Sequence, residues 1–187
     1  MGGKLDVVSL AIGAIKLVRP QRHSDQRGYF VEIWNRKAFE EAGIGSEYVQ
    51  DNSSFSRVAG TIRGLHFQRP PRAQTKLVRA LRGSVFDVVV DLRSSSTTFG
   101  RAVSALLTAE GGEQLFVPAG FAHGFCTLEP DTEVAYKVSE FYSPEHDTGI
   151  AWDDPAIGIE WPLDGRKPVL SEKDLKLPRL AEIEAPF

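Results

Sequence analysis

The sequence predicts a single all-β domain built as a jelly-roll barrel, with only short peripheral helices. Short apolar runs recur along the chain at close spacing, and Gly and Pro separate them. There is no repeat of solenoid length and no regular alternation of strands with long helical segments, so a βαβ arrangement is disfavoured. Many short strands with one brief helix favour a barrel or a two-sheet sandwich, and among these we expect the jelly roll.

The predicted elements follow from these runs and from the turn residues between them. Arg82-Gly83 is typical of a tight hairpin turn. One helix is expected over residues 36–42, because Asn35 can cap its first turn and Gly43 can end it. The expected strands span residues 12–18, 29–34, 48–52, 60–67, 74–81, 84–92, 101–107, 114–117, 124–128 and 133–138.

Length and composition indicate one domain over residues 1–187. With 42% hydrophobic residues in 187, the chain can build a substantial core without disulfides or a structural metal. The stretch 153–187 is rich in proline, which interrupts strands and helices. We therefore expect this tail to wrap the surface in turns and short helical pieces.

Charge and cysteine content exclude several classes of function. Lys plus Arg number 22 and Asp plus Glu number 25, and no dense basic run is present to follow a nucleic-acid backbone. The single cysteine, Cys126, cannot form an internal disulfide. No apolar run has membrane-spanning length, and the short run at 7–15 lacks a small-residue cleavage site after it. These features predict a cytoplasmic protein that binds neither nucleic acid nor membrane.

Lys76 is the first candidate functional residue. It shares a face of its predicted strand with Val78 and Ala80, so its side chain could point into the barrel. An ammonium group is costly to bury alone, so an inward Lys76 would need an anion that is either permanent or formed during a reaction. The alternative is an edge strand that leaves Lys76 in solvent.

His66 is the second candidate. It shares a strand face with Gly64 and Gln68, and Arg63 is close to it in sequence. A histidine in a barrel strand is often an ordinary core residue, but these neighbours favour a polar pocket.

Two stretches resemble the signatures of cupin barrels. From Gly112 to His123 the spacing of Gly, Pro, Gly and His matches the second signature. The first signature keeps its first histidine as His66, but Gln68 replaces the second histidine and Lys76 stands where a glutamate would be. A lysine cation repels a divalent ion, so no metal is expected. An ammonium can instead stabilise an oxyanion, as a metal does.

Further motifs resemble the dTDP-4-dehydrorhamnose 3,5-epimerase family, a metal-free branch of the cupin barrels. They follow the family's order with similar spacing over nearly the whole chain. The matching pieces are Asp25 to Glu32, Gln50 to Ser53, Arg63 to Gln68, Gln74 to Val78, Asp87 to Arg93, Val117 to Phe125, Tyr136, Tyr142 and Leu170 to Asp174.

The resemblance implies an isomerase that inverts C3 and C5 of dTDP-4-dehydro-6-deoxy-D-glucose to give dTDP-4-dehydro-L-rhamnose, in dTDP-L-rhamnose biosynthesis. By this resemblance His66 is the general base, Asp174 is its carboxylate partner, Tyr136 is the acid on the opposite sugar face, and Lys76 meets the enolate oxygen. The chemistry is consistent, because a proton beside a ketone is acidic only when the resulting enolate is stabilised. No redox cofactor is needed.

The same resemblance implies a set of substrate-binding residues. Read without the family, Arg27 is a turn arginine and Glu32 a solvated strand residue. At Asp147 the family usually has Glu. The implied contacts are Arg27 with the pyrophosphate, Arg63 and His123 with the sugar, Glu32, Gln50, Asn52, Asp147 and Lys173 with the nucleotide end, and Tyr142 with the thymine.

The resemblance also implies a homodimer. Alternatives from the same fold are a 3- or 5-mono-epimerase or a keto-isomerase on a related nucleotide sugar. Alternatives from other classes are a metal-dependent cupin enzyme and a non-catalytic sugar-binding cupin.

Overall fold

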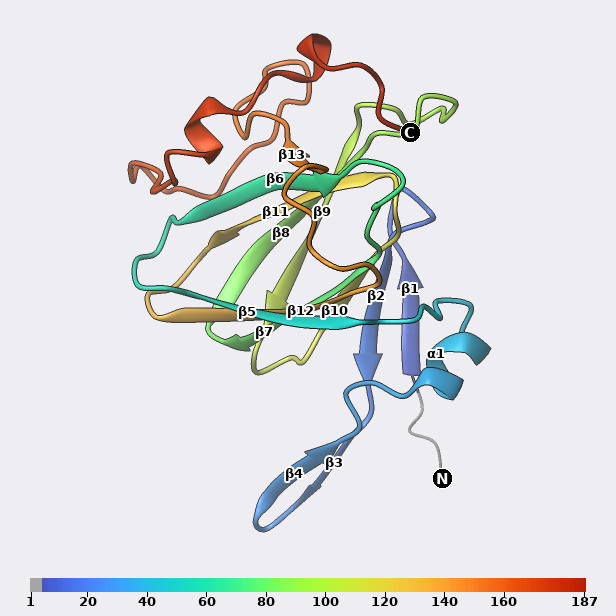
Figure 1. Ribbon diagram of the computed structural model, residues 1–187. Helices are drawn as coiled ribbons and strands as arrows, with labels where there is room; N and C mark the ends of the chain where they lie inside the picture. The colour runs from blue at the N-terminus through green and yellow to red at the C-terminus, as the bar shows by residue number, and fades with distance from the viewer. Residues whose placement is uncertain (1–4) are drawn as a thin grey trace.

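The computed structural model describes residues 5–187, which form two antiparallel sheets packed face to face as a jelly-roll, cupin-like barrel (Figure 1). The strands are β1 (Leu5–Ser9), β2 (Lys16–Pro20), β3 (Arg22–Asp25), β4 (Gly28–Val31), β5 (Gln50–Ser56), β6 (Ile62–Gln68), β7 (Lys76–Arg82), β8 (Ser84–Asp91), β9 (Ala102–Thr108), β10 (Gln114–Val117), β11 (Phe121–Thr127), β12 (Thr132–Val138) and β13 (Asp147–Gly149). The helices are α1 (Arg36–Glu41) and the 3-10 turns η1 (Asp174–Lys176) and η2 (Leu180–Glu182).

The two sheets differ in size and order. The first has the order β1-β2-β10-β7-β12-β5, and the second has the order β13-β6-β11-β8-β9. A separate hairpin, β3–β4, extends away from the barrel (Figure 1). Strands far apart in sequence are therefore neighbours, which brings residues from the whole chain to one cavity.

Strand alternation divides the apolar residues among three cores. Val78, Val89, Leu115 and Phe125 belong to the core enclosed between the two sheets. On the outer face of the second sheet, alternate residues such as Val88 pack beneath the C-terminal tail.

The third core covers the outer face of the first sheet. Leu77 and Phe116 project there and pack against Phe39 and Ile44, in and after α1. Asn35 accepts a hydrogen bond from the backbone amide of Ala38 at 3.2 Å and so caps the helix as expected.

The C-terminal tail adds little regular structure. After Asp153 it contains only the turns η1 and η2 and one isolated bridge, Thr61 with Val169. Its apolar residues, among them Trp161 and Phe187, pack on the second sheet. The tail thus forms an outer layer over that sheet and brings Asp174 toward β6.

Several predicted strand limits are wrong. The strand expected at 12–18 begins only at Lys16, because residues before it form a turn that inserts Ile12 and Ile15 into the core. The strand expected at 29–34 is half of the hairpin β3–β4 and ends at Val31.

Other limits differ because pairing partners extend or shorten a strand. The strand expected at 48–52 runs instead as β5, along the whole length of β12. That expected at 124–128 starts earlier, at Phe121, where β8 pairs with it. The strands β1, β3 and β13 were not predicted: β13 has only three residues, β1 alternates poorly, and β3 contains no apolar residue. The hairpin turn at Arg82-Gly83 is confirmed.

No helix within residues 5–187 combines the length and apolar character that crossing a lipid bilayer requires.

Candidate functional site

Two adjoining cavities open at the end of the barrel near β6, β7 and β12. The deeper one has a volume of about 400 Å³ and the outer one about 320 Å³. Both are lined by His66, Lys76, Tyr136 and Lys173, so they form one continuous site. Of the residues expected to act on or bind a substrate, all but Arg27 and Glu32 line one or both cavities.

His66 and Asp174 form a close pair in the deeper cavity. The imidazole Nε2 of His66 lies 2.6 Å from the carboxylate of Asp174, although the two are 108 residues apart in sequence. Burial raises the pKa of the Asp174 carboxyl group, but hydrogen bonds from His66, Ser171 and the Gly64 amide outweigh it and hold that pKa below its usual value. An ionised Asp174 fixes Nε2 as a donor, which leaves Nδ1 of His66 free to accept a proton.

Lys76 points into the same cavity. The strand β7 lies between β10 and β12, so the edge-strand alternative is excluded, and Lys76 is only 8% exposed. Its Nζ donates to the main-chain oxygen of His66 at 3.3 Å. Burial lowers the pKa of Lys76 to about 8, while Asp147 and Asp87 oppose this fall. The ammonium is therefore a buried cation that this cavity, which Arg63 and Lys173 also line, can offer to a developing negative charge.

Tyr136 lines the cavity from β12, in the sheet opposite His66. Burial raises the pKa of the Tyr136 phenol; the charge of Arg63 opposes this rise and that of Asp147 adds to it. The phenol is thus protonated at neutral pH and can donate a proton. Arg63 lies beside it, held by Ser56 and by the main-chain oxygen of Phe55.

His123 forms a second pair of the same kind. It stands directly opposite His66 in the register of β11 and β6, and both side chains face the cavity. Its Nε2 lies 2.8 and 3.0 Å from the two carboxylate oxygens of Asp87 on β8. Asp87 is fully buried. The sequence analysis assigned no role to Asp87; the available signal was an acidic residue flanked by apolar residues in a predicted strand.

The outer cavity gathers polar residues from β5, β13 and the tail. Gln50 donates to Asn52 at 2.8 Å, and its amide oxygen accepts from the backbone amide of Tyr142 at 3.1 Å. Asp147 accepts from the Tyr142 hydroxyl and from Lys173. The shorter arm of Asp147 thus still reaches both neighbours.

Arg27 and Glu32 lie elsewhere. Arg27 is at the tip of the β3–β4 hairpin, its side chain is 90% exposed, and it pairs with Asp25. Glu32 follows β4 at the base of the same hairpin. The hairpin points away from the barrel (Figure 1), so within one chain neither residue reaches the cavities.

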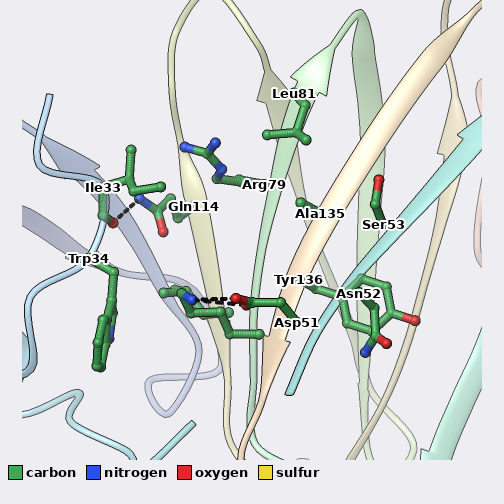
Figure 2. Close-up of a pocket in the computed structure, with 12 residues that line it drawn as sticks. Ile33, Trp34, Asp51, Asn52, Ser53, Arg79, Leu81, Gln114, Ala135 and Tyr136 are labelled. Carbon is green, nitrogen blue, oxygen red and sulfur yellow. Dashed lines mark hydrogen bonds and ion pairs between the residues drawn. The ribbon is translucent and has the colours of Figure 1, made fainter. Parts of the chain in front are cut away.

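A further hollow of about 340 Å³ lies on the other face of the first sheet. Figure 2 shows Tyr136 and Asn52 extending to one side of their strands, while Arg79 and Asp51 lie toward the other. Asp51 is paired there with Lys137 at 2.9 Å. This hollow contains no base and acid pair comparable to that in the barrel, and the exposed Leu81 borders it.

Two positions that carry metal ligands in other cupins are occupied here by Gln68 and Lys76. Gln68 is buried, and its amide is engaged by the backbone at Arg72, Phe141 and Ser143. Among residues 5–187, no group of three or more His, Cys, Asp or Glu side chains is arranged to hold a metal ion. An imidazole paired with a carboxylate, a phenol from the opposite sheet and an ammonium group in the same cavity are suited to moving protons at a carbon beside a carbonyl group.

Comparisons with known proteins show which family the chain resembles. The family model described as dTDP-4-dehydrorhamnose 3,5-epimerase matches residues 9–182. The chain is 53% identical over 191 residues to dTDP-4-dehydrorhamnose 3,5-epimerase from Sinorhizobium fredii, covering 100% of this chain and 97% of that protein.

Solved structures are similar over the same extent. One is dTDP-4-dehydrorhamnose 3,5-epimerase from Bacillus anthracis with TDP and PPi bound, with TM-score 0.92, 48% identity, and coverage of 95% of this chain and 100% of that one. Another is dTDP-6-deoxy-D-glucose-3,5-epimerase from Legionella pneumophila in complex with dTDP-4-keto-L-rhamnose, with TM-score 0.92, 41% identity, and coverage of 97% and 96%. From its fold and sequence, the chain belongs to the dTDP-4-dehydrorhamnose 3,5-epimerase family.

Proposed function

We propose that this protein inverts C3 and C5 of dTDP-4-dehydro-6-deoxy-D-glucose and so supplies dTDP-4-dehydro-L-rhamnose for dTDP-L-rhamnose biosynthesis. The observation that carries the proposal is the convergence of His66, Lys76 and Tyr136 on one cavity, with Asp174 behind the histidine. Membership of the family, and the sugar nucleotide bound by the Legionella relative, supply the substrate class.

His66 acts as the base. Asp174 accepts the Nε2 proton, so the free Nδ1 takes a proton from the carbon beside the ketone. The electrons left on carbon delocalise onto the C4 oxygen as an enolate. Lys76 carries a positive charge in a water-poor site, where its attraction to that oxygen is stronger than it would be in bulk water.

Tyr136 acts as the acid. Inversion requires a proton to leave one face of the sugar ring and another to arrive on the opposite face. Tyr136 comes from the first sheet and His66 from the second, so a ring bound between them meets a base on one face and an acid on the other. Because the ketone at C4 flanks both C3 and C5, one such pair can serve both carbons.

Deuterium exchange tests the proposal. With dTDP-4-keto-6-deoxyglucose in deuterated water, we expect deuterium at both C3 and C5 of the recovered sugar, measured by NMR. Exchange at a single carbon would instead identify a mono-epimerase. No exchange and no other product would refute sugar epimerisation.

Two variants separate the proposed roles in the same assay. His66→Ala should abolish exchange at both carbons, because one base serves both. Tyr136→Phe keeps the ring but removes the proton, so it should impair inversion more than exchange. Exchange that survives in His66→Ala would assign the base to another residue.

We also propose a homodimer in which each β3–β4 hairpin serves the other chain. Tyr29 and Phe30 of the hairpin are 57% and 71% exposed, which is unusual for large apolar side chains on a short hairpin. A second copy that covered them would also bring Arg27 toward a cavity that its own chain does not let it reach. Arg27 would then hold the substrate pyrophosphate with its planar fork of donors.

The expected location is the cytoplasm. Its support is the single, buried, unbridged Cys126, which is compatible with a reducing compartment.

A further inference from the structure

Asp87 is a fully buried carboxylate directly behind the cavity residue His123, and the proposed reaction gives it no role so far. Its neighbours along β8 alternate: Val85 and Val89 face the core between the sheets, so Asp87 faces it too. A carboxylate without water or a partner is costly in such a place. Burial raises the pKa of the Asp87 carboxyl group above its usual value, and the nearby His123 and Lys76 oppose this rise. An ionised Asp87 therefore depends on these two neighbours.

The side-chain hydrogen bonds of Asp87 are made with His123. Both carboxylate oxygens lie within 3.0 Å of His123 Nε2. The His123 side chain is only 8% exposed to solvent, and His123 lines the cavity. With Nε2 engaged by Asp87, the ring nitrogen left for the cavity is Nδ1.

Lys76 is the second group whose charge interacts with that of Asp87. Burial lowers the pKa of Lys76, and the charges of Asp147 and Asp87 oppose that fall. The other ionisable groups around the two cavities are Arg63 and His66 on β6, Asp87 on β8 behind His123 on β11, Tyr136 on β12, Asp147 on β13, Tyr142 in the loop before β13, and Lys173 and Asp174 in the tail.

We propose that Asp87 is an ionised positioning residue: it holds the imidazole of His123 with Nε2 protonated and Nδ1 as an acceptor for a sugar hydroxyl, and it keeps Lys76 charged. The inference rests on the proposed function and extends it. The site then contains two histidine–carboxylate pairs side by side. His66 with Asp174 moves protons, and His123 with Asp87 fixes the sugar and supports the cation that meets the enolate.

The ring state of His123 can be measured without substrate. In protein labelled with ¹⁵N-histidine, the two ring nitrogens of each of the four histidines report which one carries the proton, and the spectrum of a His123→Asn variant assigns the signal. Near neutral pH, at about 7.5, we expect the His123 ring to carry its proton at Nε2 only. Protonation at Nδ1 only would mean that Asp87 is a neutral donor, and protonation at both would remove the acceptor; either result overturns the proposal.

The charge of Lys76 is tested with Asp87→Asn, which keeps the shape and removes the charge. In lysine labelled with ¹³C, the pKa of Lys76 should fall by about one unit in this variant, because a nearby opposite charge has been lost. The alkaline limit of kcat/KM should move down by the same amount. An unchanged Lys76 titration overturns the proposal.

Asp91→Asn is the matched control. Asp91 lies on the same strand and is equally buried, but it binds Arg93, Ser96 and Thr98 in the next loop. This variant should lose stability without moving the Lys76 titration. If Asp87→Asn does not fold, the histidine spectrum of the unchanged protein still decides the question. A wild-type protein that fails to act on the keto sugar would refute the proposed function, yet both NMR measurements would still test Asp87.

Discussion

Lys76 shows how burial changes the chemistry of one residue. Its ammonium lies on the inner face of β7 with 8% of the residue exposed, and it donates a hydrogen bond to the main-chain oxygen of His66. Burial lowers its pKa to about 8, so at neutral pH the group is still charged but titrates within reach of ordinary assays. A lysine at this position of a metal-binding cupin would repel the metal ion; here Lys76 itself supplies the positive charge.

The pH dependence of the reaction follows from this residue. Because the proposed role needs the ammonium, kcat/KM should fall as pH rises through about 8, the pKa of Lys76. The measurement is the rate of deuterium exchange across the neutral to alkaline range. Lys76→Met should reduce kcat by roughly 10²- to 10³-fold, as for loss of a group that stabilises an oxyanion. A rate that stays constant well above pH 8 would argue against a required ammonium.

The pair of strands β6 and β11 sets the distance between the two histidines. Gly64 and Gly124 lie against each other, and a Cβ built on Gly124 would be 2.7 Å from the Arg63 carbonyl oxygen and 3.1 Å from the Gly64 Cα. The register of the two strands shifts between His123 and Phe125, beside this contact. The absence of side chains here lets the two backbones approach and holds both imidazoles at one cavity.

Substitution of Gly124 tests this approach of the strands. Gly124→Ala should lower the free energy of unfolding by about 1–3 kcal/mol, because the backbones must separate to admit the methyl group. It should also slow exchange, because His123 lies next to the substitution. Gly13→Ala is the control, since a Cβ there meets nothing within 4 Å. Chemical denaturation and the exchange assay measure the two effects; a Gly124→Ala protein of normal stability and rate would show that the contact is not needed.

At the scale of the molecule, the barrel contains nearly the whole site, but two apolar parts of its surface have no role within one chain. The hairpin β3–β4 stands clear of the barrel, and the hollow in Figure 2 lies on the outer face of the first sheet, bordered by Ile33 and Leu81. Ile33 and Leu81 are 38% and 39% exposed. Apolar surface of this kind is typical of contact between chains, which is why the proposed dimer is placed at the hairpin.

Mixing of variants distinguishes action within a chain from action between chains. Arg27→Ala alone should raise KM by about 10- to 100-fold, as for loss of a charge-assisted hydrogen bond, and His66→Ala alone should be inactive. If Arg27 serves the partner, chains unfolded and refolded together should form mixed dimers with one intact site, restoring roughly a quarter of wild-type activity at low substrate concentration. Activity no higher than the average of the two separate variants would mean that Arg27 does not act across the dimer.

The family resemblance named Tyr136 and Asp174, whereas patterns along the chain predicted the fold class, the helix α1, the hairpin turn at Gly83 and the candidates His66 and Lys76. These are local: alternation within a strand decides that Lys76 and Val78 share a face, and motif spacing decides that Gln68 and Lys76 occupy the positions of cupin metal ligands. Strand limits were less accurate, because the partner strand determines where a strand such as β5 ends. The family resemblance named Asp174 as the partner of His66, and the folded chain supplied their distance of 2.6 Å across 108 residues. That Asp87 engages His123, and that Arg27 stays outside the cavity of its own chain, could be seen only in three dimensions. The physical reason is that hydrogen bonds and charges act through distances in space, and a one-dimensional pattern gives the facing direction of a side chain but not what it meets there.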